Sequence, residues 1–339
     1  MADTAKNEEG AALGRPKADF LPALLVPALA LVALPLVFDL PAWITLTVAG
    51  LAMGLMIFIM ASGLTLVFGL MDVLNFGHGA FISLGAFVGT VILLPLSGWM
   101  QADSFWLNMA AVVPAILVAM VVSGAVGYAF ERVIITPVYG QHLKQILITM
   151  GGLIVAEQLI HVIWGPDQIP LTRPTTFRGA FIFGDVAIEK FRLIAVAIGL
   201  LVFVAMYMVL NRTRVGLLIR AGVENGEMVE ALGYRIRRLF VGVFVAGSAL
   251  AGLGGVMWAL YQETVTAAMG MQVMVLIFIV IIIGGLGSVG GCFIGAMLVG
   301  LVANYTGFLA PKLALGSNIL LMVLILLWRP QGLYPVAKR

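Results

Sequence analysis

Long segments without charge dominate this sequence and limit the folds open to it. Residues 264–311 form a run of 48 residues without Asp, Glu, Lys or Arg, and residues 41–71 are also uncharged. Of the whole chain, 62% is hydrophobic and 10% is charged, whereas soluble domains carry about 25% charged residues. A transmembrane helix needs about 20 consecutive apolar residues. We therefore predict an all-α fold, a polytopic transmembrane helical bundle, and expect no nucleic-acid partner.

The apolar runs predict about eight to ten membrane spans. The count depends on Gly284-Gly285-Leu286-Gly287, because a full turn there gives ten spans and a re-entrant segment gives fewer. Residues 1–19 are polar and are expected to form a flexible cytoplasmic tail, followed by one transmembrane domain, residues 20–339. The expected spans are residues 20–38, 41–71, 78–96, 104–130, 145–164, 193–210, 239–262, two within 264–311, and 313–328.

The basic residues are distributed unequally among the polar segments. Of the 19 Lys and Arg residues, 14 fall in residues 1–19, 131–144, 211–238 and 329–339, and five fall in the remaining loops. Cytoplasmic loops of membrane proteins carry an excess of Lys and Arg. The distribution therefore predicts that both termini are cytoplasmic and that the loop 165–192 lies outside.

Residues 211–238, the basic segment, form the only long polar interruption in the second half of the chain. The segment carries six arginines and is expected to contain two short amphipathic helices. Asn225 is expected to cap the second helix, Glu227 places negative charge in its first turn, and Gly233 ends it. Met228, Ala231 and Leu232 then share one face. Two interpretations remain open: the segment only fixes topology, or it is a docking element that packs against a cytoplasmic partner.

Several motifs resemble those of the permease subunits of ABC importers, in particular the high-affinity branched-chain amino-acid permease family. The resemblance covers residues 45–335, and Gly226 and Glu230 depart from the pattern expected in the coupling helix. The motifs that carry it are Arg220-Ala221 followed by Glu224-Asn225, Glu227-Met228 and Leu232-Gly233; the runs Gly63–Gly69, Asn75–Ala80 and Leu84–Ala86; and the C-terminal Gly284–Ser288 and Arg329–Leu333.

This resemblance implies a transport subunit rather than an enzyme. It implies a translocation pathway for branched-chain or related amino acids in the bacterial inner membrane. The implied partners are a second homologous permease, with a heterodimer favoured, two ATP-binding subunits and an extracytoplasmic substrate-binding protein. The chain lacks a G-x-x-x-x-G-K-[ST] motif, so ATP is expected to be used by the partners, and we expect no cofactor or metal on this chain. The resemblance assigns ATPase coupling to Arg220, Glu224, Asn225, Glu227, Met228, Ala231, Leu232 and Gly233.

A second set of residues is predicted to line the translocation pathway. Polar groups near a helix break also serve to satisfy free backbone groups, and glycines also serve close helix packing, so both interpretations remain open. Glu157 and His161 lie one helical turn apart, and either bond to each other or a neighbouring helix, or line the pathway. The candidates are Asn75, His78, Glu157, His161, Gly284, Gly285, Gly287 and Ser288.

Two alternative functions follow from the same residues. Within the same family, the transported compound would be urea or a short amide, since specificity lies largely in the separate binding protein. In a different class, the chain would be an ion-coupled secondary transporter or channel, which Glu157 and His161 alone favour. A short similarity between residues 79–82 and 291–294 also points to an internal repeat, as transporters often contain.

Overall fold

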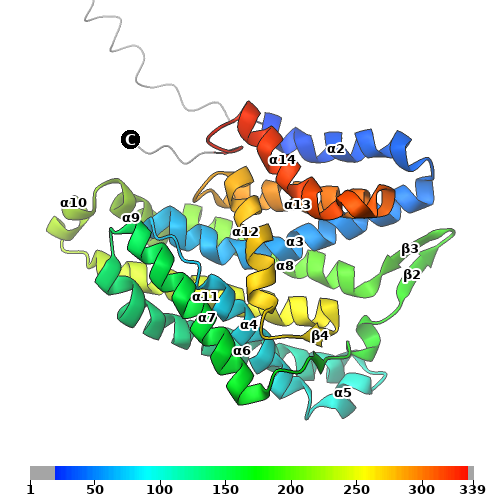
Figure 1. The fold of residues 1–339 in the computed structure, drawn as a ribbon, viewed down its shortest axis with the longest axis horizontal. Coiled ribbons are helices and arrows are strands. Elements are labelled where there is room, and N and C mark those ends of the chain that lie inside the picture. The colour runs from blue at the N-terminus through cyan, green and yellow to red at the C-terminus, as the bar shows by residue number, and fades with distance from the viewer. Residues whose placement is uncertain (1–19, 335–339) are drawn as a thin grey trace, which may run out of the picture.

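Apolar helices form the bundle seen in Figure 1. The computed structural model describes residues 20–334, without the side chains of Val223, Glu224 and Leu315. Within that range six helices are long and apolar enough to cross a membrane, and four shorter ones are equally apolar. The long ones are α3 (Leu40–Met71), α6 (Phe105–Phe130), α7 (His142–Trp164), α8 (Lys190–Arg212), α11 (Ile236–Gln262) and α13 (Val289–Leu309); the short ones are α2 (Leu21–Val37), α4 (His78–Leu93), α12 (Met269–Gly284) and α14 (Ala314–Trp328).

The predicted helical bundle is confirmed, and each expected span corresponds to one helix. The glycine break is a turn between two separate helices, because α12 ends at Gly284 and α13 begins at Val289. The predicted tail, residues 1–19, lies outside the described residues. Loops at one end of the bundle carry α9 (Arg214–Glu224) and α10 (Gly226–Ala231), and we call this the basic end.

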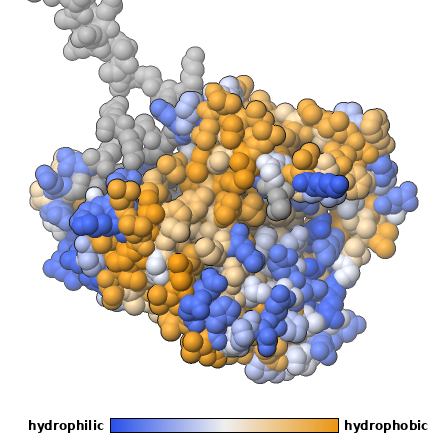
Figure 2. Space-filling model, in the orientation of Figure 1, coloured by the Kyte–Doolittle hydropathy of each residue, from blue (hydrophilic) through white to orange (hydrophobic). Residues whose placement is uncertain are grey.

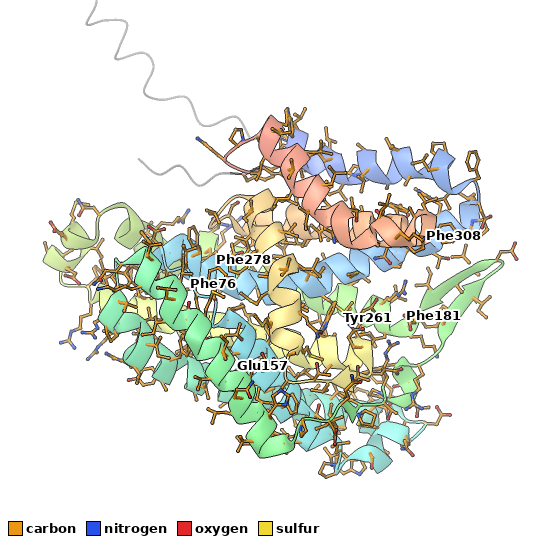
Figure 3. All side chains as sticks on the ribbon, in the orientation of Figure 1. Phe76, Glu157, Phe181, Tyr261, Phe278 and Phe308 are labelled. Atoms are coloured by element: carbon orange, nitrogen blue, oxygen red, sulfur yellow. The ribbon has the colours of Figure 1, made fainter. Side chains whose placement is uncertain are left out.

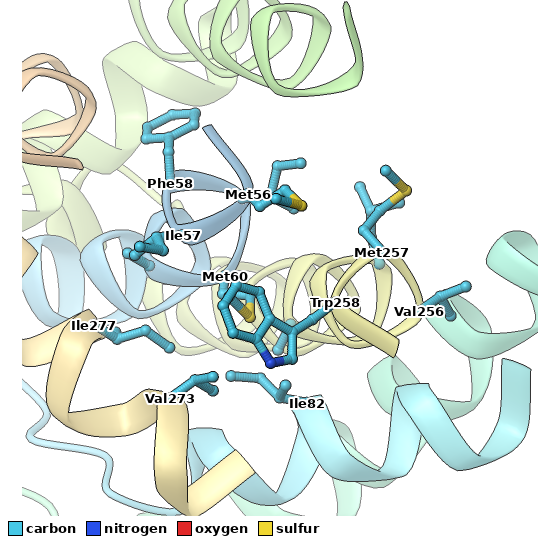
Figure 4. Close-up of a cluster of buried hydrophobic side chains, with 14 of the residues drawn as sticks. Met56, Ile57, Phe58, Met60, Ile82, Val256, Met257, Trp258, Val273 and Ile277 are labelled. Carbon is cyan, nitrogen blue, oxygen red and sulfur yellow. The ribbon is translucent and has the colours of Figure 1, made fainter. Parts of the chain in front are cut away.

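Helices α3 and α11 lie at the centre of the bundle. Side chains from α3, α4, α11 and α12 interdigitate there, including the fully buried Phe58 and Ile277 (Figure 4). In a membrane, packing of this kind replaces the hydrophobic effect as the main attraction between helices, and small residues permit it. Gly63 of α3 meets Gly247 of α11 so closely that a Cβ at Gly247 would lie 2.7 Å from the Gly63 carbonyl oxygen.

Helices α4 and α12 both begin inside the bundle. Nε2 of His78, the first residue of α4, lies 2.9 Å from the carbonyl oxygen of Met60, which is 11 residues, or about 16 Å, before the end of α3. The start of α12 meets the start of α4, since the Ser83 hydroxyl donates to Ala267 O at 2.8 Å and accepts from Gly270 N at 2.9 Å. Both helices have 16 residues, about 24 Å, which is less than the thickness of the membrane interior.

The helix contacts have an internal symmetry. Helix α3 packs against α13 as α11 packs against α6, and α4 packs against α6 and α7 as α12 packs against α13 and α14. When α3 is exchanged with α11 and α4 with α12, the α3–α11 contact and the α4–α12 contact each correspond to themselves. These contacts match α4 with α12. The short similarity between residues 79–82 and 291–294 would instead match α4 with α13, and the internal repeat stays a prediction.

The end opposite α9 and α10, the hairpin end, contains the strands, which the all-α prediction did not include. Strand β1 (Ile169–Pro170) pairs with β4 (Thr264–Val265), and β2 (Ala180–Phe183) forms an antiparallel hairpin with β3 (Val186–Glu189). The hairpin projects from the bundle at the right of Figure 1. The short helix α5 (Ser97–Gln101) lies at the same end.

Candidate functional site

The basic segment contains the two short helices that the sequence predicts. The Thr213 hydroxyl caps α9 by accepting from Gly216 N at 3.3 Å. The Asn225 carboxamide caps α10 by accepting from Met228 N at 2.9 Å. Gly233 follows α10 with φ of 89°, a left-handed conformation that suits glycine. Glu227 lies in the first turn of α10, where negative charge is favourable.

Helix α10 turns most of its apolar side chains away from the rest of the chain. Met228 is 57% exposed and Leu232 is 69% exposed, and Ala231 between them is also exposed. We call these three residues the docking face. Val229 is the residue of α10 that is buried, and it lines an open groove of about 350 Å³ between α9, α10 and α11. Within residues 20–334 these three side chains are exposed, and their role in coupling stays a prediction.

The arginines around α10 are almost unpaired. Among the residues the structure describes, the six arginines of the basic segment form no ion pair, and their only side-chain hydrogen bond joins Arg220 Nε to Gly216 O at 3.4 Å. Two of them, Arg235 and Arg238, line the same groove as Val229. The side chain of Glu224, also predicted to act in coupling, lies outside the described residues. The segment thus presents an apolar face with positive charge beside it.

Of the predicted pathway residues, Asn75 and His78 lie in the interior of the bundle. Both are buried, and the two polar atoms of the Asn75 carboxamide have no hydrogen-bond partner in the described chain. The adjacent Phe76 donates its backbone N–H to Thr149 of α7 at 3.1 Å and its ring contacts Phe278 of α12, as Figure 3 shows. These contacts join the link between α3 and α4 to α7 and α12, and a pathway role for Asn75 and His78 stays a prediction.

The predicted glycine motif lies in the turn between α12 and α13. Gly285 and Gly287 have φ of 96° and 83°, and a Cβ at Gly287 would lie 2.5 Å from Gly69 Cα at the end of α3. Gly284 contacts the backbone of Gly291 in the same close manner. The Ser288 hydroxyl caps α13 by accepting from Gly291 N at 3.1 Å. The motif fixes a tight turn at the basic end, and its pathway role also stays a prediction.

Glu157 and His161 both lie on α7, and Figure 3 labels Glu157 on the face that it shows. The expected hydrogen bond between them is not formed, and within residues 20–334 the Glu157 carboxylate has neither a hydrogen bond nor an ion pair. The Nδ1 atom of His161 is buried without a partner. A hydrogen bond between Glu157 and His161 therefore does not explain the presence of these two polar residues in α7.

The match to a known protein family decides the class of this chain. Residues 46–328 match the model of the family described as branched-chain amino acid transport system, permease component. The chain belongs to this family. Family membership and the apolar helices together make the chain a multi-pass membrane protein and the transport component of an ABC system.

Individual permeases of this family are similar to this chain along most of their length. The chain is 28% identical over 296 residues to the high-affinity branched-chain amino acid transport permease BraD of Pseudomonas aeruginosa, covering 84% of this chain and 94% of BraD. It is 26% identical to LivH of Escherichia coli K12, covering 84% and 92%. It is 26% identical to LivM, a probable branched-chain amino acid permease of Methanocaldococcus jannaschii, covering 82% and 90%. No solved structure matches the chain.

Three residues that hold these sites in place were missed by the sequence analysis. Ser83 joins the starts of α4 and α12, Val229 anchors α10, and Arg173 fastens the loop at the hairpin end. Val229 and Met228 are both apolar, and nothing in the sequence marks Val229 rather than Met228 as the buried one. Arg173 follows a proline-rich run, and its contacts with α11 join residues 87 and 88 positions apart, which no local pattern indicates.

Proposed function

We propose that this chain is one of two permease subunits of a bacterial ABC importer that carries branched-chain amino acids across the inner membrane. The observation that carries the proposal is the docking face on α10. A short capped helix holds three apolar residues in solvent beside unpaired arginines, at one end of a bundle that is otherwise well packed. Such a face needs a partner, because an isolated two-turn helix is unstable in water.

The partner of the docking face is an ATP-binding subunit. The chain has no phosphate-binding loop of its own, so ATP is bound and hydrolysed elsewhere. Movement of the ATP-binding subunits displaces α10, and α10 transmits this movement to α11 through the groove lined by Val229 and Ile236. The permeases then change between two packings, which open the pathway to either side in turn. Because the relatives include permeases named LivH and LivM, we propose a heterodimer of two such permeases.

The proposed orientation places the basic end in the cytoplasm and the hairpin end outside, with both termini inside. Outside, the hairpin end meets the substrate-binding protein. Single cysteines at Asn225 and Arg178, in a Cys292→Ser background, should react with an impermeant thiol reagent from opposite sides of the membrane. Reaction of both from the same side would contradict this orientation.

The transport function is tested by reconstitution. The chain, its second permease, two ATP-binding subunits and a leucine-loaded binding protein are assembled in liposomes, and uptake of radioactive leucine is measured. We expect uptake that requires ATP and stops when the ATP-binding subunits are omitted. If the assembly takes up urea or a short amide and not leucine, the proposed substrate is wrong and the importer function stands. Uptake by the chain alone, driven by an ion gradient, would overturn the importer itself.

A further inference from the structure

Helix α7 exposes two sides of different character. With about 100° between successive residues, Glu157 and His161 lie together on one side, while Val155 and Leu159 lie on the opposite side. Val155 is 59% exposed and Leu159 is 54% exposed, as is usual for a helix that faces lipid. Glu157 and His161 are both partly exposed. One helix thus presents an apolar side and a polar side at the same depth.

Glu157 lies within α7, a helix long and apolar enough to cross a membrane. It lies seven residues, or about 10 Å, before the end of α7 at Trp164. Beyond it, Val162 and Ile163 are 82% and 64% exposed, so the apolar surface of the helix continues past Glu157. Ionised side chains that face lipid at such depth are strongly disfavoured, and those that occur face a partner or a water-filled cavity.

No group of the described residues accounts for Glu157. No hydrogen bond or ion pair of its carboxylate occurs in the part of the chain that the structure describes. Arg173 at the hairpin end already pairs with the Glu189 carboxylate and donates to the Leu260 carbonyl oxygen near the end of α11. What remains is water or a group of the proposed second permease, since an ionised group at such a position faces either a partner or a water-filled cavity.

Other groups on the same face are also polar. Figure 2 shows hydrophilic side chains that extend from the hairpin end, at the lower right, toward the middle of the face, between apolar regions above them and to their left. Near the hairpin end of α11, Gln262, Glu263 and Thr264 are exposed, and α12 exposes Gln272 on its first turn. This face therefore differs from the purely apolar surface that lipid requires.

We infer that the Glu157 side of α7 faces a water-filled passage, and that its carboxylate attracts the ammonium group of the transported amino acid. The second part rests on the proposed function. An amino acid carries one cationic group, and the unpaired carboxylate on this face supplies the complementary charge within the membrane. His161, one turn away, is itself partly exposed, and its Nδ1 atom is buried without a partner in the described chain.

The water-filled passage is tested by cysteine accessibility, which needs no transport. Glu157→Cys and the matched control Leu159→Cys, two residues apart on α7, are placed separately in the Cys292→Ser chain and inserted into liposomes with the partner subunits. A charged, membrane-impermeant thiol reagent is supplied on both sides. We expect Glu157→Cys to react at least about tenfold faster, because the reagent attacks a thiolate in water. Equal rates, or faster reaction at Leu159→Cys, would overturn the inference.

The role of the carboxylate is tested by two conservative variants in the reconstituted importer. Glu157→Gln keeps the shape and removes the charge, whereas Glu157→Asp keeps the charge. We expect leucine uptake to fall about tenfold in Glu157→Gln and by less than about threefold in Glu157→Asp, with the ATP-binding subunits still bound in both. Wild-type uptake by Glu157→Gln would overturn the ammonium role. If the wild-type assembly itself carries no leucine, the proposed function fails, and the accessibility result still decides whether the passage exists.

Discussion

Two polar segments of equal length interrupt the bundle, and they differ in how far the chain completes them. The loop 165–192 at the hairpin end is closed on its own chain by Arg173, whose side chain is 12% exposed. Its guanidinium contacts Glu189 Oε1 at 2.6 Å, donates to Leu260 O at 2.8 Å and to Tyr261 O at 2.6 Å, and lies 5.0 Å from the Phe191 ring centre. The basic segment, residues 211–238, has six arginines and no ion pair in the described chain.

This difference indicates where a partner is required. A loop whose buried cation donates from all three of its nitrogens is stable without outside help, since hydrogen bonds to the carbonyls at the end of α11 satisfy groups that the helix leaves free. The basic segment instead leaves three apolar residues and five arginine side chains without contacts of that kind. We therefore expect substitutions in the two segments to have different effects: loss of stability at the hairpin end and loss of coupling at the basic end.

The largest effect is expected for Leu232→Asp on the docking face. A carboxylate there would be buried without a partner when the ATP-binding subunit docks, which costs several kcal/mol or about a thousandfold in affinity. Substrate-stimulated ATPase activity should be lost while the melting temperature of the isolated chain stays unchanged, and Leu232→Met should retain activity. By contrast, Val229→Asp, three residues away at the buried position of α10, should unfold α10 itself. Normal ATPase stimulation in Leu232→Asp would remove the docking face from the mechanism.

The next largest effect is expected for Arg173→Ala at the hairpin end. Removing the guanidinium leaves Glu189 and the carbonyls of Leu260 and Tyr261 without their donor, at a cost of about 2–4 kcal/mol. Thermal unfolding in detergent should therefore begin at a clearly lower temperature. Arg237→Ala in the basic segment is the matched control, and should change the free energy of unfolding by less than about 0.5 kcal/mol. Equal losses in the two variants would break the contrast between the segments.

A smaller and local effect is expected for Asn225→Ala. The lost cap costs α10 about 1 kcal/mol, a factor of about five in its opening equilibrium. Amide hydrogen exchange should accelerate by that factor at residues 228–232 and remain unchanged in α11, and Asn225→Asp should restore the slow exchange. Unchanged exchange in Asn225→Ala would mean that α10 does not depend on its cap.

The smallest effect is expected from acid at the hairpin end. Burial alone would raise the pKa of Glu189, but the hydrogen bonds and charges of Arg173 and Arg192 outweigh it and hold the pKa below its ordinary value. The stabilisation is therefore complete above the ordinary pKa of about 4.3 and declines as the pH falls through the folded value. The difference in melting temperature between the wild-type chain and Glu189→Gln should narrow as the pH falls from about 6 to about 3. A difference independent of pH would show that the charge of Glu189 has no part in it.

The sequence predicts the helices better than their depth. Uncharged runs and glycine or proline punctuation locate the ten apolar helices, and cap residues such as Asn225 locate α10. That α4 begins beside Met60 within the bundle leaves no mark in composition, because residues at every depth are equally apolar. The same limit applies to Glu157: its place on α7 follows from spacing, whereas its lack of a partner depends on which helices surround it. Long-range contacts such as those of Arg173 are decided by the fold alone.

The central claim, that the docking face binds an ATP-binding subunit, is tested most directly by site-specific photo-crosslinking in the assembled complex. A photoreactive amino acid is placed either at Leu232, 69% exposed on α10, or at Phe183, 67% exposed on the hairpin. Both positions are apolar and equally exposed, and they lie at opposite ends of the bundle. We predict a crosslink to the ATP-binding subunit from Leu232 and none from Phe183. A crosslink to that subunit from Phe183, or its absence from Leu232 in a complex that hydrolyses ATP, would contradict the account.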